Sequence, residues 1–254
     1  MKLLQTNYSN FILKQFDMYK FCFLFFLLIC FETGYAQYSR SSYGLSIIEE
    51  VTELQRSIAK DSNKAFVSLK DYIPEILLDI KYATKSNVFQ EQFYDHSYAL
   101  LRKPAAEALL RVQSELLPKG LSLKIYDAYR PYSVTCRMWS IIPDTTYMGL
   151  PWKGSKHNRG IAVDLTLIDT LSGKELAMPT AFDAFVKEAH PSYSDLPKEV
   201  KQNRDLLIST MTKHGFSVDP VEWWHFNFNS AIEYELLDLP HHQIIQILQL
   251  IKKN

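Results

Sequence analysis

The sequence predicts an α+β fold: a single domain with helices packed on a central antiparallel sheet. Segments with helical spacing of apolar residues and segments with strand-like alternation both occur, but not in the regular order of a parallel α/β fold. Of the 254 residues, 47% are hydrophobic and 22% are charged, which is ordinary for a globular protein and excludes disorder as its main state. Beyond residue 36 the chain has no repeat and no long linker, so we expect one domain over residues 37–254.

Two helices are predicted in the first half of the chain. Apolar residues recur close to helical spacing over residues 46–60, which indicates an amphipathic helix. The second helix covers residues 104–116, with Pro104 at its start and Pro118 and Gly120 just beyond its end. A proline at a helix start and breakers after its end are typical helix signals.

Three segments are predicted to be strands of the sheet. Residues 121–126 read LSLKIY and alternate between apolar and polar side chains. Residues 161–167 form a second strand-like run, and residues 221–228 form a looser third one.

Three more helices are predicted in the second half of the chain. They cover residues 182–189, 204–213 and 242–252. Gly215 follows the second of these helices and marks its end.

The chain begins with the features of an export signal. Residues 21–31 read FCFLFFLLICF, an apolar run spanning about 16 Å of a bilayer core that is about 30 Å thick. Lys14 and Lys20 precede this run, and small residues at Gly34 and Ala36 fit a signal peptidase site. We expect residues 1–36 to be a signal peptide, and the mature protein to be periplasmic or otherwise exported without stable membrane insertion. An uncleaved amphipathic anchor is the alternative.

Charge and cysteine content limit the partners. Lys plus Arg number 28 and Asp plus Glu number 28, so the formal net charge is zero and no nucleic-acid partner is expected. The cysteines are Cys22, Cys30 and Cys136, and the first two lie in the predicted signal peptide. The one that remains can form neither a disulfide framework nor a thiolate zinc cluster. The sequence leaves the oligomeric state open.

Two short segments far apart in the sequence carry candidate metal chemistry. His157 and Asp164 flank one predicted strand, and Glu222 precedes His225 by three residues in another. Three of these four groups suffice to hold Zn²⁺ with an open position, which leaves a carboxylate to act as base. Hydrogen-bonded core histidines are the alternative. Strict strand alternation would direct Glu222 and His225 to opposite faces, so either a bulge or a strand end lies there or the segment is not a regular strand.

Arg130 lies in the segment YDAYRP, where a predicted strand runs into a turn fixed by Pro131. A rigidly held guanidinium could stabilise an oxyanion. The alternative is a structural ion pair between Arg130 and a nearby aspartate.

Other conspicuous side chains are expected to have no part in this chemistry. Trp223 and Trp224 are predicted to be wall and core residues. The remaining histidines are predicted to be surface or capping residues: His96, His190, His214, His241 and His242.

The runs DAYRP, SKHNRGIAVDLTL and EWWHF, in this order, resemble the VanX-type D-alanyl-D-alanine dipeptidases of the zinc D,D-peptidase superfamily. Residues 79–84 (DIKYAT), 178–185 (MPTAFDAF) and 203–204 (NR) extend the resemblance over most of the predicted mature chain. The roles that it implies are these: His157, Asp164 and His225 bind one Zn²⁺ per chain, Glu222 is the general base, Arg130 stabilises the tetrahedral intermediate, and Tyr82, Ser155 and Asp183 hold the dipeptide, with Asp183 pairing with its ammonium group.

The function expected from this resemblance is that of an exported zinc metallopeptidase that hydrolyses D-alanyl-D-alanine to free D-alanine by Glu-assisted attack of zinc-bound water. One alternative is a D,D-carboxypeptidase or endopeptidase acting on longer peptidoglycan stem peptides. Another is a non-catalytic binding module that keeps the metal for stability, which would need neither Glu222 nor Arg130. Export fits scavenging of D-alanine or cell-wall turnover better than destruction of cytoplasmic wall precursors.

Overall fold

The computed structural model describes residues 39–40, 42–73 and 75–253, which form one compact unit. The predicted signal peptide, including the apolar run at residues 21–31, lies outside the described residues. Among the helices of the described part of the chain, none combines the length and the apolar content needed to cross a bilayer.

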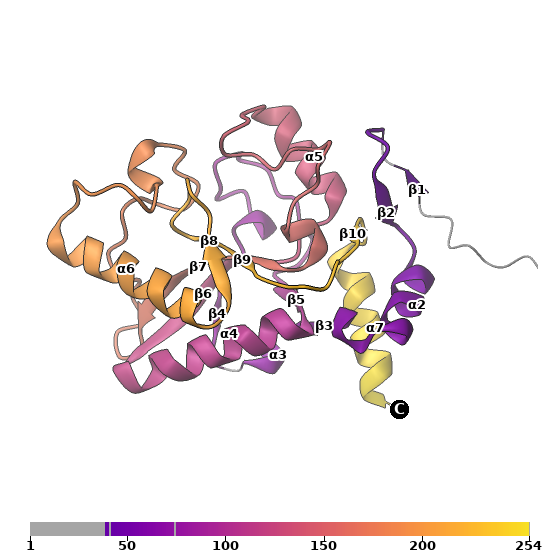
Figure 1. The fold of residues 1–254 in the computed structure, drawn as a ribbon, viewed down its shortest axis with the longest axis horizontal. Coiled ribbons are helices and arrows are strands. Elements are labelled where there is room, and N and C mark those ends of the chain that lie inside the picture. Colours follow the sequence, from indigo (N-terminus) through magenta and orange to yellow (C-terminus); the bar gives the residue numbers. More distant parts are fainter. Residues whose placement is uncertain (1–38, 41, 74, 254) are drawn as a thin grey trace, which may run out of the picture. The chain divides into compact units, whose positions relative to one another are not determined.

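A five-stranded sheet forms the centre of the fold (Figure 1). Its strands are antiparallel except at one edge, where the first strand runs parallel to its neighbour. The α+β prediction is confirmed, as are the strands predicted at residues 121–126 and 161–167. In spatial order the strands are β4 (Leu77–Leu78), β6 (Leu121–Asp127), β7 (Ala162–Asp169), β9 (His225–Phe228) and β8 (Phe216–Val218).

Helices α4 (Lys103–Leu116) and α6 (Lys198–Lys213) cover one face of this sheet (Figure 1). Val163 and Leu165 of β7 are fully buried in the same core as the apolar side of α4. Burial of one such side chain stabilises a fold by about 1.5–3 kcal/mol. The helix predicted at residues 104–116 is confirmed, and the one predicted at residues 204–213 begins earlier than expected, at Lys198.

A smaller sheet and two helices lie beside this core (Figure 1). The predicted helix at residues 46–60 is only partly right, because its first residues form β2, and the helix α2 begins at Val51. The helix predicted at residues 242–252 is confirmed as α7. The bounds are β1 (Ser39–Arg40), β2 (Ser46–Ile48), β10 (Leu236–Leu237), α2 (Val51–Lys60) and α7 (His241–Lys253), with β2 pairing with both β1 and β10.

Further short elements complete the chain between these two parts. A two-stranded sheet joins β3 and β5, and a helix, α5, follows β6. Short 3₁₀ turns also occur, and one of them carries His157. The bounds are β3 (Phe66–Ser68), α3 (Leu69–Tyr72), β5 (Leu100–Arg102), α5 (Tyr132–Ile141) and the 3₁₀ turn His157–Arg159.

Two predicted elements are wrong in extent or type. Residues 182–189 do not form an α-helix, since Asp183 has φ +56° and only a 3₁₀ turn at Lys187–Ala189 follows. A left-handed residue cannot continue a right-handed helix. The strand predicted at residues 221–228 begins only at His225, and the residues before it form a turn.

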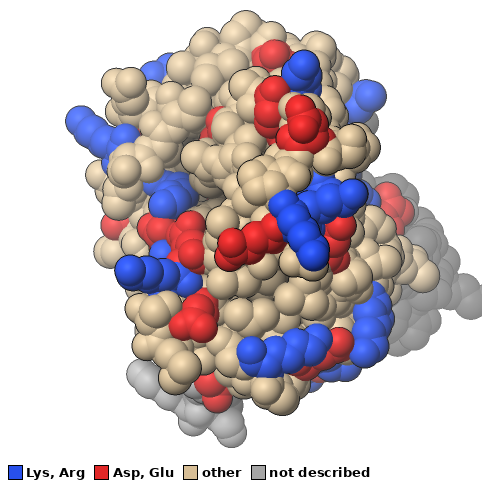
Figure 2. Space-filling view, turned by 90° about the vertical axis from the view of Figure 1, so that its left-hand side faces the viewer, with Lys and Arg blue, Asp and Glu red and all other residues tan. Residues whose placement is uncertain are grey.

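The other conspicuous side chains follow the sequence-based expectation with one exception. Trp223 and Trp224 are buried, as predicted. His241 is buried and its Nε2 lies 2.9 Å from the Tyr129 carbonyl oxygen, so it is not a surface residue. On the face drawn in Figure 2, basic and acidic side chains are interspersed, and that face has no continuous patch of one sign.

Candidate metal centre

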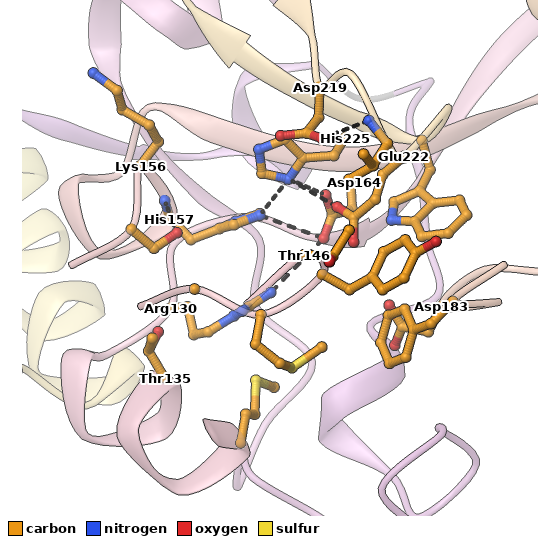
Figure 3. Close-up of a pocket in the computed structure, with 18 of the residues that line it drawn as sticks. Arg130, Thr135, Thr146, Lys156, His157, Asp164, Asp183, Asp219, Glu222 and His225 are labelled. Carbon is orange, nitrogen blue, oxygen red and sulfur yellow. Dashed lines mark hydrogen bonds and ion pairs between the residues drawn. The ribbon is translucent and has the colours of Figure 1, made fainter. Parts of the chain in front are cut away.

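Three potential ligand atoms converge at the pocket side of the central sheet (Figure 3). His157 Nε2 lies 3.1 Å from His225 Nδ1, and His225 Nδ1 lies 2.9 Å from Asp164 Oδ1. The third side of this triangle, from His157 Nε2 to Asp164 Oδ2, is 3.4 Å long. Two imidazoles and one carboxylate that point at one another in this way form a set that could hold a metal ion.

Strand register explains why two of these residues meet. Asp164 of β7 is the direct antiparallel partner of His225 of β9. The residues on either side of Asp164, Val163 and Leu165, point into the core beneath the helices. Because side chains alternate along a strand, Asp164 points to the opposite face, and so does the directly paired His225.

The third residue, His157, is held by a tight turn. Asn158 is fully buried, and its Nδ2 donates to the Arg130 carbonyl oxygen and to Thr135 Oγ1. Gly160 ends the turn with φ +71°, and a Cβ there would lie 2.4 Å from an atom of the Phe66 ring. Only glycine fits that position without displacement of its neighbour. The turn therefore fixes His157 beside the end of β7.

Hydrogen bonds on the far side of each ring select the imidazole tautomer. His157 Nδ1 lies against the Ala128 carbonyl oxygen and must donate to it, which leaves Nε2 free to act as a ligand. His225 Nε2 lies 3.2 Å from Asn227 Oδ1, which leaves Nδ1 to face Asp164. Such outer partners are typical of metal-binding histidines. Asn227 was not predicted from the sequence.

Charges within the cluster hold a proton on His225. Burial alone would lower the pKa of His225, but Asp164 outweighs it, and the pKa is raised to about 9. Burial also opposes ionisation of Asp164, yet the two imidazoles bring the pKa of that carboxyl below its usual range. The site thus attracts positive charge.

Glu222 lies in the turn just before β9, with its Oε2 3.9 Å from His225 Nδ1. Glu222 and His225 can face the same cavity because β9 begins only at His225. Glu222 precedes the strand, so its side chain does not follow the strand alternation. Burial raises the pKa of the Glu222 carboxyl well above its usual range. A carboxyl with a raised pKa is suited to exchange protons near neutral pH.

Arg130 follows the end of β6 and lies beside the cluster. Its Nε and Nη2 donate to Asp127 Oδ2 at 2.9 and 2.8 Å, and Nη2 lies 3.8 Å from Asp164 Oδ2. The ion pair considered as an alternative therefore exists, and Arg130 also lines the cavity. Asp127 and Asn158 were not singled out in the sequence, although an aspartate three residues before the arginine was a usable signal.

Tyr82 and Asp183 lie on another side of the same cavity. The Tyr82 hydroxyl donates to Asp183 Oδ2 at 2.9 Å. Burial, together with the charge of Asp164, raises the pKa of the Asp183 carboxyl to about 8. Asp183 also has a left-handed backbone, and strained residues of this kind are concentrated at binding sites.

The cavity has a volume of about 240 Å³. The eight residues singled out in the sequence all line it, including Ser155 in the turn before His157. Figure 3 shows the side chains of His157, Asp164 and His225 between Lys156 on one side and Asp183 on the other. Lining residues that sequence reasoning missed include Thr135, Met138, Thr146, Tyr147, Met148, Phe185, Asp219 and Asn227.

The donor set suits zinc. Two imidazole nitrogens and one carboxylate oxygen match the ligand types of hydrolytic zinc sites, which keep one position open for water or substrate. A second carboxylate, Glu222, lies beside the ligands without belonging to the set. Fold and site together define the class of a metal-dependent hydrolase.

Comparison with known proteins identifies the family. A family model described as D-ala-D-ala dipeptidase, peptidase M15, matches residues 62–246. The chain therefore belongs to this peptidase family, whose members are zinc enzymes.

Two curated relatives agree with this assignment. The chain is 37% identical over 171 residues to a D-alanyl-D-alanine dipeptidase of Escherichia coli (strain K12), covering 67% of this chain and 88% of that protein. It is 30% identical over 181 residues to one of Enterococcus faecium, covering 63% of this chain and 90% of that protein. Among solved structures, the LdcB LD-carboxypeptidase aligns with a TM-score of 0.39 and 19% identity, covering 65% of this chain and 67% of that chain.

Proposed function

We propose that this protein is an exported zinc dipeptidase that hydrolyses D-alanyl-D-alanine to two molecules of D-alanine. The observation that carries the proposal is one cavity that holds the three-residue ligand set, a separate carboxylate at Glu222 and a second buried carboxylate at Asp183. Membership of the dipeptidase family supports the choice of substrate.

In this proposal His157, Asp164 and His225 hold one zinc ion per chain. Bound there, zinc would lower the pKa of a water molecule and polarise the peptide carbonyl. Glu222 takes a proton from the attacking water as its oxygen forms a bond to the carbonyl carbon. The same carboxyl then returns a proton to the leaving amine as the C–N bond breaks. Its position 3.9 Å from a ligand nitrogen supports both transfers.

Arg130 stabilises the negative charge that develops on the carbonyl oxygen. Its side chain is nearly buried, so the guanidinium acts in a medium where charge interactions are strong. Loss of one such donor commonly lowers turnover by a factor of about 10² to 10³.

Asp183 and Tyr82 bind the ammonium end of the dipeptide. Ser155, in the turn before His157, also lines the cavity and helps to hold the dipeptide. An ammonium group would compensate the buried charge of Asp183 and lower the pKa that burial has raised. The wall beyond Asp183 includes Phe185, and Tyr147 stacks on it with ring centroids 5.2 Å apart. If these rings close the cavity beside Asp183, it takes a dipeptide in preference to a longer peptide.

Export is part of the proposal. The apolar run at residues 21–31 and the small residues before Gln37 support a signal peptide over residues 1–36 and a catalytic domain over residues 37–254. An enzyme outside the cytoplasm would recover D-alanine or act in wall turnover.

Product analysis tests the proposed activity. Purified zinc-loaded protein is incubated with D-Ala-D-Ala, L-Ala-L-Ala, N-acetyl-D-Ala-D-Ala and a stem pentapeptide that ends in D-Ala-D-Ala. We expect free D-alanine chiefly from the unmodified D,D-dipeptide. Release of D-alanine from the pentapeptide at a comparable rate would instead favour the D,D-carboxypeptidase alternative.

A further inference from the structure

We propose that Asp127 and Tyr94 are positioning residues, which hold the Arg130 guanidinium toward the reacting carbonyl and away from Asp164. The inference rests on the proposed function, because it explains how one group of that site is kept in place. Neither residue lines the cavity. Tyr94 bonds Asp127, and Asp127 bonds Arg130, while the Asp127 Oδ2 atom also lies 3.7 Å from His157 Nδ1.

A β-bulge directs Asp127 to the site. The pairing of β6 with β7 is regular up to Ile125, which lies opposite Leu165, but Asp127 then lies opposite Asp164. Tyr126 is therefore the extra residue. Ile125 points into the core beneath the helices, and strict alternation would send Asp127 to the same face. The bulge reverses that direction, as bulges beside active sites commonly do.

The bulge brings together two carboxylates, and Arg130 separates them. Like charges opposite each other on neighbouring strands destabilise a sheet, so a cation between Asp127 and Asp164 is needed. Arg130 bonds Asp127 through both Nε and Nη2 but stays 3.8 Å from Asp164 Oδ2. Among the described residues no hydrogen bond uses Arg130 Nη1, which is left to donate to a ligand in the cavity.

Tyr94 fixes the other oxygen of Asp127. Its hydroxyl donates to Asp127 Oδ1 at 2.9 Å, and both side chains are buried. Burial raises the pKa of Tyr94 well above its usual range, so the hydroxyl remains a donor. The carboxylate is thus held at one oxygen by Tyr94 and at the other by Arg130.

The arrangement keeps the arginine from competing with the metal. A weaker hold by Asp127 would let the guanidinium move onto Asp164, the nearest other carboxylate. That movement would take the donor away from the carbonyl oxygen and place a positive charge on a metal ligand. A displacement of about 1 Å in a catalytic group can lower turnover by a factor of about 10².

A double-mutant cycle tests this role. Tyr94→Phe and Asp127→Asn are each made in the full chain and in an Arg130→Ala chain. The measurements are zinc content, kcat and KM for D-Ala-D-Ala, and calorimetric Kd for a D-Ala-D-Ala phosphinate, a charged tetrahedral analogue of the intermediate. Tyr129→Phe is the matched control, because its hydroxyl is buried and bonds the Leu239 carbonyl oxygen without touching Asp127.

With Arg130 present, we expect Tyr94→Phe to lower kcat and weaken phosphinate binding about tenfold, with KM and zinc content little changed. In the Arg130→Ala chain, Tyr94→Phe should leave kcat and phosphinate binding unchanged. The control Tyr129→Phe should leave both quantities unchanged in the full chain and in the Arg130→Ala chain. Equal losses in both backgrounds, or no loss in either, would overturn the positioning role.

Tyr94→Phe removes only the hydroxyl and retains the aromatic ring. The test therefore stays decisive even if the Asp127→Asn variant fails to fold. A wild-type protein that does not cleave D-Ala-D-Ala would instead overturn the proposed function, and the positioning role with it. If the wild-type protein cleaves D-Ala-D-Ala but Tyr94→Phe causes the same loss in the full chain and in the Arg130→Ala chain, the positioning role alone would be overturned.

Discussion

Asp164 and His225 face each other directly across the β7–β9 pair, with His225 Nδ1 2.9 Å from Asp164 Oδ1. Because the two residues are direct partners, their side chains lie on the same face of the sheet, and a slip of either strand by one residue would move its side chain to the opposite face. Two of the three candidate zinc ligands are therefore placed by the backbone of the sheet itself. The third, His157, depends on a turn held by Asn158.

The first prediction concerns metal content. The purified protein should contain about one zinc per chain, since the three ligand atoms form one set with one open position. Replacing His157, Asp164 or His225 by alanine should remove most of the zinc, as measured by plasma emission spectroscopy after dialysis. His214→Ala is the control, because His214 bonds Glu115. Full zinc in all three ligand variants would show that the metal lies elsewhere.

The second prediction concerns pH. In the zinc-free protein the pKa of His225 is raised to about 9 from its ordinary value of 6.5. The ion pair with Asp164 therefore contributes its full stability below pH 6.5 and loses it as the pH rises through 9. Zinc must displace the proton from His225, so zinc affinity should rise with pH over the same window.

Calorimetry of zinc binding in two buffers of different ionisation enthalpy checks this expectation. Near neutral pH, binding should release about one proton from His225. Chemical denaturation of the zinc-free protein should show a loss of stability between about pH 6.5 and pH 9 that is smaller in a His225→Gln variant. Zinc affinity that is independent of pH over this window would contradict the assignment.

The third prediction concerns the general base. Glu222→Gln should keep the zinc and the fold but lower kcat by a factor of about 10² to 10⁴, because it removes the proton acceptor and leaves the ligands. The checks are steady-state kinetics and metal analysis on the same preparation. Glu175→Gln is the surface control, since that carboxylate is partly exposed and pairs with Lys124. Wild-type turnover in Glu222→Gln would assign the proton transfer to another group.

Secondary structure could be predicted from the sequence where the local pattern of apolar residues agrees with the tertiary environment. Residues 121–126 alternate because one face packs against helices and the other does not, and the structure has a strand there. Residues 182–189 have apolar side chains near helical spacing, yet Asp183 adopts φ +56° and the helix does not form. The tertiary contact between Asp183 and Tyr82, which leaves no trace in local spacing, accompanies that departure.

The candidate site shows the same division. The residues that come together were predictable as a set, because carboxylates and imidazoles in short motifs are themselves the chemical signal. The residues that orient them were not predictable. Tyr94 acts through one hydrogen bond to Asp127 in a distant segment, and Asn227 acts through one hydrogen bond to His225 in the same strand. The strand at Ser46–Ile48 was missed because only three residues form it, and one of its two partners, Leu236–Leu237, lies far along the chain.

The fourth prediction concerns the leader. We expect the mature protein to begin at Gln37, since Gly34 and Ala36 offer small side chains at the positions that a signal peptidase inspects. Expression of the full chain in a host with a periplasm, followed by fractionation and N-terminal sequencing, measures the start directly. An intact leader in the membrane fraction would favour the uncleaved anchor.

The last prediction concerns substrate length. A free ammonium group would favour the charged form of the buried Asp183 carboxyl and pair with it, whereas an N-acylated or longer peptide would lose this ion pair, because burial raises the pKa of the unpaired carboxyl to about 8. Loss of such a partner reduces cleavage by orders of magnitude. We therefore expect kcat/KM for D-Ala-D-Ala to exceed that for N-acetyl-D-Ala-D-Ala and for a stem pentapeptide by a factor of about 10² or more.

Asp183→Asn should narrow this difference by harming the dipeptide most, because the amide keeps the size of the side chain and removes its charge. The proposal also requires that the cavity wall formed by Phe185 and Tyr147 exclude further residues, and the Tyr147 hydroxyl lies 3.1 Å from His190 Nε2 while its ring stacks on Phe185. Tyr147→Ala should therefore admit longer peptides without changing the preference for a free ammonium group among dipeptides. Equal kcat/KM for the dipeptide and the pentapeptide in the wild-type protein would mean that the cavity does not end at Asp183. The enzyme would then be a carboxypeptidase.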